Sequence, residues 1–196
     1  MEDFQNIKCI TAYKILEGQI RECYGRAVYS HKTHEKCADI LLTRLSRIKI
    51  LQLLLSATTT GSFITILFGS DYIGSIVGVV LSTALLCLNA YTKEYDLGEI
   101  AQKHKQAVND IWLIREQYLS LITDLRIGDK EIKNLQSERD RLSSSLHAIY
   151  SGSPSTTSSA YKKAQYALQH NEEMTFSDQE IDAFLPKELR RINLEP

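Results

Sequence analysis

Charge is missing from one long stretch of this sequence. All 23 basic residues and all but one of the 24 acidic residues lie outside residues 50–92, and the exception, Asp71, stands in the middle of that stretch. Nine Lys/Arg against six Asp/Glu precede the stretch, and fourteen against seventeen follow it. Neither flank carries the strong positive charge that is typical of nucleic-acid-binding proteins. We therefore expect no direct binding to DNA or RNA.

A cleavable signal peptide and a disulfide framework are missing as well. The chain begins with the acidic sequence MEDF and has no hydrophobic signal region there, so we expect any insertion signal to be internal. Only four cysteines occur. If residues 8–47 form one helix, Cys9, Cys23 and Cys37 are spaced about 21 Å apart at 1.5 Å per residue, too far to bridge within a chain. This cysteine usage suits a reducing cytosol.

Motifs of catalysis are also lacking. There is no glycine-rich phosphate loop, no GxSxG elbow and no Walker pattern. His31 and His34 would share a helix face near Cys23 and Cys37, which raises the question of zinc, but no CxxC or HExxH motif accompanies them. We favour interfacial histidines over a metal site. The sequence predicts a protein that is not an enzyme, without catalytic residues, metal or cofactor.

The uncharged stretch divides into two runs, residues 50–70 and 72–92, of 21 residues each. Each run gives about 32 Å of helix at 1.5 Å per residue, which matches a hydrocarbon core of roughly 30 Å. Gly69-Ser70-Asp71 between them has the composition of a turn. We expect a transmembrane helical hairpin. The alternative is a buried hairpin inside a soluble helical bundle, which the Ser/Thr content of the first run favours.

Basic residues flank the two runs, whereas the turn between them has none. They are Lys32, Lys36, Arg44, Arg47 and Lys49 before the first run and Lys93 after the second. The positive-inside rule then places both termini in the cytoplasm.

Polar and small residues recur along both runs. The candidate pore-lining or interhelical residues are Gln52, Ser56, Thr59, Thr60, Ser75, Ser82 and Asn89. Small residues at four-residue spacing allow close packing of helices, and they are Ala57, Gly61, Gly74 and Gly78. Polar groups are costly in lipid, so these rows should face protein or water. The polar side chains either form hydrogen bonds within the hairpin or line a water path. The water path requires a homo-oligomer, because one hairpin encloses no pore.

The rest of the chain predicts long helices. Residues 1–49 form an amphipathic helix, and residues 93–150 form a helical segment with a strong stripe from Leu97 to Leu125. Gly128 and Asp129 have the composition of a C-cap and an N-cap, so we expect a turn and an antiparallel return helix there. A Ser-rich linker, 151–160, precedes short helices within 161–196, where Ser177 begins a capping box. The fold class is an all-α membrane protein, a transmembrane hairpin flanked by long cytoplasmic helices that form a bundle.

Short motifs along nearly the whole chain resemble one family. They are Tyr24-Gly25-Arg26-Ala27 and Ser30-His31 before the hairpin, Trp112, Tyr118-Leu119 and Leu121 after it, and Tyr161-Lys162-Lys163-Ala164 and Glu180-Ile181-Asp182-Ala183-Phe184-Leu185-Pro186 in the tail. This arrangement resembles the SLATT family, two-transmembrane effector domains encoded beside nucleotide-second-messenger synthetases or nucleotide sensors in bacterial conflict systems.

The resemblance implies an antiphage effector of the bacterial inner membrane. Such an effector assembles in the bilayer and permeabilises it when a partner sensor or nucleotide signal activates it, which arrests or kills the infected cell. The tail resembles that of members encoded near reverse transcriptases, which implies a nucleotide-synthesising enzyme, a sensor or a reverse transcriptase as a neighbouring partner. The alternative function is a non-conducting membrane anchor that scaffolds or restrains a cytoplasmic enzyme.

Overall fold

The chain folds into helices around one long central helix. The computed structural model describes the backbone of residues 2–69, 72–186 and 190, and the side chains in these ranges except at 2–10, 65–68 and 73. These ranges contain no strand. The helices are α1 (Glu2–Phe68), α2 (Tyr72–Glu94), α3 (Leu97–Ile127), α4 (Ile132–Gly152), α5 (Ser158–Gln169) and α6 (Asp178–Phe184). The all-α class expected from the sequence is confirmed.

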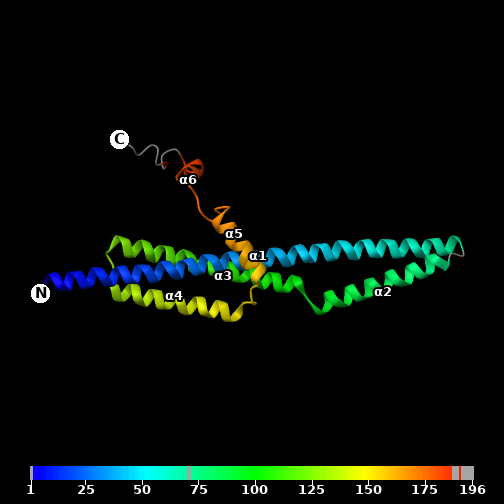
Figure 1. Ribbon diagram of the computed structural model, residues 1–196, viewed down its shortest axis with the longest axis horizontal. Coiled ribbons are helices and arrows are strands. Elements are labelled where there is room, and N and C mark those ends of the chain that lie inside the picture. The colour runs from blue at the N-terminus through cyan, green and yellow to red at the C-terminus, as the bar shows by residue number, and fades with distance from the viewer. Residues whose placement is uncertain (1, 70–71, 187–189, 191–196) are drawn as a thin grey trace.

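Helix α1 is a single rod of 67 residues, about 100 Å long at 1.5 Å per residue. The boundary expected between residues 49 and 50 is therefore no break in the backbone. The residues around it contain neither glycine nor proline, so nothing interrupts the helical hydrogen bonds. Helix α2 runs back along the C-terminal half of α1, and α3 continues along the N-terminal half (Figure 1). Of the expected turn at 69–71, Ser70 and Asp71 lie outside the described residues.

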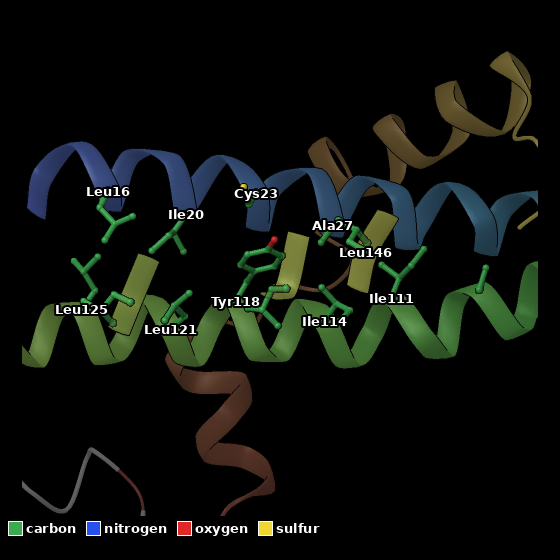
Figure 2. Close-up of a cluster of buried hydrophobic side chains, with 13 residues drawn as sticks. Leu16, Ile20, Cys23, Ala27, Ile111, Ile114, Tyr118, Leu121, Leu125 and Leu146 are labelled. Atoms are coloured by element: carbon green, nitrogen blue, oxygen red, sulfur yellow. The ribbon is translucent and has the colours of Figure 1, made fainter. Parts of the chain in front are cut away.

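A three-helix core joins α1, α3 and α4 (Figure 2). Its members are Leu16, Ile20, Cys23 and Ala27 of α1, Ala107, Ile111, Ile114, Tyr118, Leu121 and Leu125 of α3, and Leu135, Leu142 and Leu146 of α4. The stripe expected from Leu97 to Leu125 is buried in the structure, with Ala101 in the core and the neighbouring Ile100 only half-buried. Period-3.6 patterning places one face of each helix in the core.

The turn expected after α3 is confirmed. Gly128 adopts φ +78°, the left-handed conformation that glycine reaches without steric cost, and its N–H donates to the Asp124 carbonyl at 3.1 Å. The sequence indicated Asp129 as the N-cap of α4. In the structure the N-cap is Glu131, and its side chain makes no capping hydrogen bond. Helix α4 returns along α3 (Figure 1).

The tail has a shorter linker than the composition predicts. Helix α4 extends to Gly152, and α5 begins at Ser158 because the Thr157 hydroxyl accepts the Ala160 N–H at 3.2 Å. The linker is therefore 153–157 and not 151–160. The capping box at Ser177 is confirmed, since its hydroxyl accepts the Glu180 N–H and the Glu180 carboxylate accepts the Ser177 N–H.

Candidate functional site

A side-chain hydrogen bond links the two helices of the α1–α2 hairpin at the end nearer the bundle. The Gln52 amide donates to Asn89 Oδ1 at 2.8 Å and to the Thr92 hydroxyl at 3.3 Å. An amide in an apolar setting is costly unless it is paired. This pairing brings together Gln52 and Asn89, two of the residues expected in the polar rows.

The hydroxyl groups of the hairpin are largely satisfied within their own helices. Several donate to the carbonyl three or four residues earlier at 2.7–3.0 Å: Thr58, Thr59, Thr60, Ser62, Ser82 and Thr83. A hydroxyl bonded in this way presents mainly its methyl or methylene group to the surroundings. The hydroxyl rows are therefore compatible with lipid or protein neighbours and do not by themselves require water.

The structure divides the polar row expected on the first run. Gln52 and Thr59 are half-buried on the side of α1 that meets α2, whereas Ser56 and Thr60 are exposed. Successive residues of a helix are 100° apart, so the four side chains span about 100° of the helix circumference, with Gln52 and Thr59 at the edge nearer α2 and Ser56 and Thr60 at the other edge. The sequence grouped them as one stripe, whereas α2 covers only one edge of that stripe.

The small residues divide in the same way. Gly78 is buried against α1, and a Cβ atom at that position would lie 3.5 Å from Ser62 Cβ. Gly74, Ser75 and Ser82 of α2 are half-buried. Ala57 and Gly61, in contrast, are exposed, and a Cβ at Gly61 would meet nothing within 4 Å.

Four exposed small or hydroxyl-bearing side chains of α1 lie on the same side of the helix, which we call the outer face of α1. It consists of Ser56, Ala57, Thr60 and Gly61. No described residue of α2 covers this face.

Arg44 of α1 contacts Tyr91 of α2 at the end of the hairpin nearer the bundle. Arg44 Nη2 donates to the Tyr91 hydroxyl at 2.9 Å, and the guanidinium lies 5.8 Å from the centroid of the Tyr91 ring. The ring of Tyr95 lies 5.1 Å from that of Tyr91. Sequence reasoning used Arg44 only as a flanking charge and missed Tyr91. The signal available was an aromatic residue at the end of an uncharged run, where amphipathic rings are typical of a membrane interface.

The hairpin leaves its apolar side chains uncovered. Large exposed ones are Ile50, Leu51, Leu53, Leu54, Phe63, Ile64, Ile76, Val77, Val79, Val80 and Leu86. One helical stretch among the described residues is long and apolar enough to cross a membrane; it lies within Gly74–Ile127, and almost none of its apolar window is buried. The expected first span, 50–70, extends beyond the described residues. A soluble core helix would be mostly buried, which this stretch is not.

One family model covers most of the chain. The model described as SMODS and SLOG-associating 2TM effector domain family 4 matches residues 16–180. The chain belongs to this SLATT family. The family predicted from the sequence is thereby confirmed. None of the curated proteins and none of the solved structures matches the chain. The family description and the uncovered apolar helix together indicate a membrane protein with an effector domain.

Two histidines of the SLATT chain meet where α1 packs on α3. Nδ1 of His34 and Nδ1 of His104 lie 2.9 Å apart, and both side chains are buried. Burial, and then the nearby His104 and His31, lower the pKa of His34 to about 4. Burial also lowers the pKa of His104. His34 is thus the interfacial histidine that the sequence predicted, while its partner, 70 residues away, was missed.

The residues considered as zinc ligands in the sequence do not form a metal site among the described residues. In the described part of the chain no three His, Cys, Asp or Glu side chains lie close enough to hold a metal ion. Cys23 and Cys37 are buried free thiols, Cys87 is an exposed one, and the side chain of Cys9 is outside the described residues. Nδ1 of His31 is buried without a hydrogen-bond partner among the described residues.

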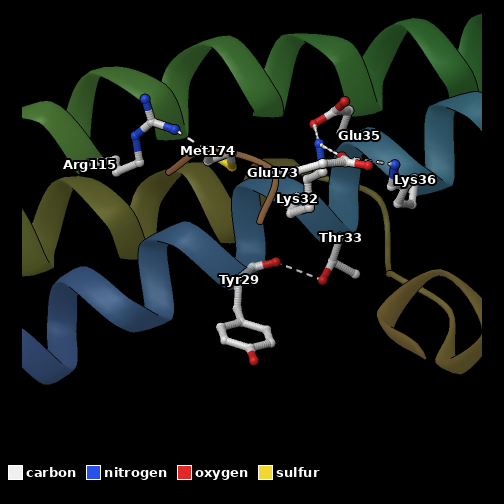
Figure 3. A network of polar contacts seen from close by, with 8 residues as sticks. All are labelled: Tyr29, Lys32, Thr33, Glu35, Lys36, Arg115, Glu173 and Met174. Atoms are coloured by element: carbon white, nitrogen blue, oxygen red, sulfur yellow. Dashed lines mark hydrogen bonds and ion pairs between the residues drawn. The ribbon is translucent and has the colours of Figure 1, made fainter. Parts of the chain in front are cut away.

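An ion-pair cluster holds the tail of the SLATT chain against α1 (Figure 3). The Glu173 carboxylate lies 2.5 Å from Lys32 Nζ and 3.3 Å from Lys36 Nζ, and Lys32 also pairs with Glu35 at 2.9 Å. The hydrogen bond from Lys32, and then the one from Lys36, lower the pKa of Glu173 to about 2. Burial would lower the pKa of Lys32, but its bonds to Glu173 and Glu35 outweigh that effect and raise it.

Proposed function

We propose that the α1–α2 hairpin crosses a membrane twice, with both ends of the chain on the cytoplasmic side. Both helices present exposed apolar side chains, as Leu53, Phe63 and Leu86 exemplify. In water such a surface is unfavourable by roughly 25 cal/mol per Å². Lipid removes this penalty, and the basic residues that flank the hairpin, Arg44 and Lys93 among them, then lie at the cytoplasmic surface.

In this proposal, copies of the protein assemble through their hairpins and permeabilise the bacterial inner membrane. The outer face of α1 carries the proposal, because it is exposed and combines small residues with hydroxyl groups. Small residues let the backbones of neighbouring helices approach closely, and this packing drives helix association in lipid. Two helices cannot enclose a water path, so the contact between copies would create it.

The family provides the biological setting of the proposal. SMODS and SLOG association points to a conflict system, and we infer an effector of antiphage defence by abortive infection. A neighbouring sensor, nucleotide-synthesising enzyme or reverse transcriptase would trigger it. No catalytic role is proposed, and the lipid bilayer and further copies of the chain are the expected partners.

Ion flux through liposomes tests the proposal. Purified full-length protein is reconstituted, alone and with the product or protein of the neighbouring gene, and release of a trapped dye is measured. S56L/T60L fills the outer face with bulky apolar side chains and should abolish release. The matched control is T58L/T83L, which makes the same chemical change at two exposed hydroxyls outside that face. If release is unchanged in S56L/T60L, the outer face does not form the path.

The second candidate function is a non-conducting anchor that recruits or restrains a cytoplasmic enzyme. It is favoured by exposed apolar side chains on α3, namely Trp112, Leu113 and Leu119, which are 49%, 52% and 45% exposed. Large aromatic and aliphatic side chains are typical anchors of protein interfaces. If no condition gives dye release while the neighbouring enzyme still binds, and W112A weakens that binding, the anchor replaces the pore.

A further inference from the structure

A basic groove lies between α1 and α5. Its volume is about 730 Å³, in the range of sites that hold small molecules. Its lining includes five basic side chains, Lys36, Arg44, Arg47, Lys162 and Lys163, and two acidic ones, Asp39 and Glu173. The groove therefore has a formal charge of +3, whereas the whole chain has −1. Positive charge is concentrated here and not spread over the molecule.

Packing of α5 on α1 fixes the two walls of this groove. Ala160, Ala164 and Ala167 form the face of α5 that meets α1, and all three are buried. Alanine side chains are short, so the helix axes come close and the longer side chains at the edge of the contact flank the gap. Lys162 and Lys163 stand on one wall, and Arg47 stands on the other. Helix α5 crosses α1 about half-way along the rod (Figure 1).

Three of the cations have no counter-ion in the part of the chain that the structure describes. Arg47, Lys162 and Lys163 are exposed and pair with no acidic side chain of the described residues. Glu173, in contrast, is already neutralised by Lys32 and Lys36. Like charges that face each other across a groove repel, which is unfavourable unless an anion lies between them.

We propose that this groove binds a phosphate-bearing anion between Arg47 and the pair Lys162–Lys163. Guanidinium and ammonium groups are the donors that phosphate oxygens prefer, and arginine can bind two oxygens at once. Tyr166 and Asn171 in the same lining supply further polar groups for the remainder of a ligand. Such an anion would tie the tail of the chain to the central rod.

The position of the groove favours the headgroup of an anionic phospholipid as the source of that phosphate. Arg47 precedes Ile50, the first residue of the uncharged run, by three residues, about 4.5 Å along the helix. Basic clusters beside a membrane-crossing helix attract anionic lipids by about 1 kcal/mol per Lys or Arg. A soluble phosphorylated compound has the same recognition chemistry. The lipid source rests on the proposed membrane insertion, whereas the anion site does not.

Titration calorimetry of the full-length protein in zwitterionic detergent tests the site. The probes are dihexanoyl phosphatidylglycerol, sn-glycerol 3-phosphate and, as the uncharged reference, dihexanoyl phosphatidylcholine. Both anionic probes should bind more tightly than the reference, and K162Q/K163Q should weaken them at least tenfold. R47Q on the other wall should weaken both probes as well. The matched control is K105Q/K133Q, which removes two exposed lysines elsewhere.

The outcomes separate the two sources. Binding of phosphatidylglycerol at least tenfold tighter than glycerol phosphate supports a lipid headgroup, and equal affinity supports a soluble anion. If neither anionic probe binds better than the reference, or if the control pair weakens binding as much as K162Q/K163Q, the proposal is overturned. Dye release from liposomes without anion binding would overturn the proposed anion site and leave the proposed pore intact. Anion binding without dye release would overturn the pore and leave the anion site intact.

Discussion

Nδ1 of His34 and Nδ1 of His104 share one hydrogen bond of 2.9 Å between α1 and α3. One of the two nitrogens donates and the other accepts, so at least one ring must be neutral there. A second proton would place two donors face to face. The contact between the two helices is thus sensitive to acid.

We expect the protein to lose stability below about pH 6.5. An unfolded histidine titrates near 6.5, whereas His34 in the fold has a pKa of about 4. The unfolded chain therefore binds more protons between these values. Stability is complete above pH 6.5 and falls as the pH drops towards 4, by about 3 kcal/mol for this group. Thermal unfolding in detergent, followed by circular dichroism, measures the loss.

Substitution of both histidines provides the check. H34Q/H104Q should flatten the dependence of the melting temperature on pH between 6.5 and 4. H147Q removes an exposed histidine and should leave that dependence unchanged. A steep dependence that survives in H34Q/H104Q would assign the acid sensitivity to other groups.

Substitutions at Gly78 should separate α1 from α2 according to their size. A Cβ at this position would lie 3.5 Å from Ser62 Cβ, an ordinary contact, so G78A should be tolerated. Leucine has three more carbon atoms than alanine, and α1 occupies the space that they would need, so G78L should force the helices apart. Distances between spin labels on α1 and α2, measured by double electron-electron resonance, report the separation. G61L, on the outer face of α1, should leave the distance within one copy unchanged.

Truncation in the three-helix core should destabilise the protein strongly. Ile111 is fully buried between α1, α3 and α4. I111A removes buried carbon atoms and leaves a cavity, so we expect a loss of about 2–5 kcal/mol in the free energy of unfolding. Ile15 on α1 is 69% exposed, and I15A is the matched control, with a change within about 0.5 kcal/mol. Equal effects of the two variants in thermal unfolding would contradict this core.

Loss of the Glu173 carboxylate should release the tail. E173Q removes the ion pairs with Lys32 and Lys36, so amides near residues 171–186 should exchange hydrogen faster. E172Q alters a neighbour without an ion pair among the described residues and is the control. In the wild type the same release should occur in acid. The carboxylate has a folded pKa of about 2, so its contribution is complete above about pH 4.5 and disappears as the pH falls through 2.

Most of the helices could be predicted from local sequence. The stripe from Leu97 to Leu125 indicated α3, Gly128 indicated its end, and Ser177 indicated the start of α6. These signals lie within one or two turns of the residues that they specify. The predicted ends of the linker were wrong. Thr157 caps α5, but the composition does not distinguish it from the other Ser and Thr residues of the linker.

The sites were less predictable than the helices. Sequence reasoning named Gln52 and Asn89 separately, but their hydrogen bond joins residues that are 37 positions apart. It grouped Ser56 with Thr59, although only Thr59 faces α2. The basic groove needs Lys162 and Lys163 beside Arg47, and no local pattern predicts that α5 docks there.

By itself the sequence determined the helical class, the uncharged hairpin, the turn after α3 and the family, because helix periodicity, capping and charge are properties of neighbouring residues. Tertiary structure alone decided which polar side chains meet between α1 and α2, and that His34 meets His104. These depend on the rotation of each helix about its axis and on contacts between distant segments. The packing of all the core side chains together selects both the rotation of each helix and the contacts between distant segments.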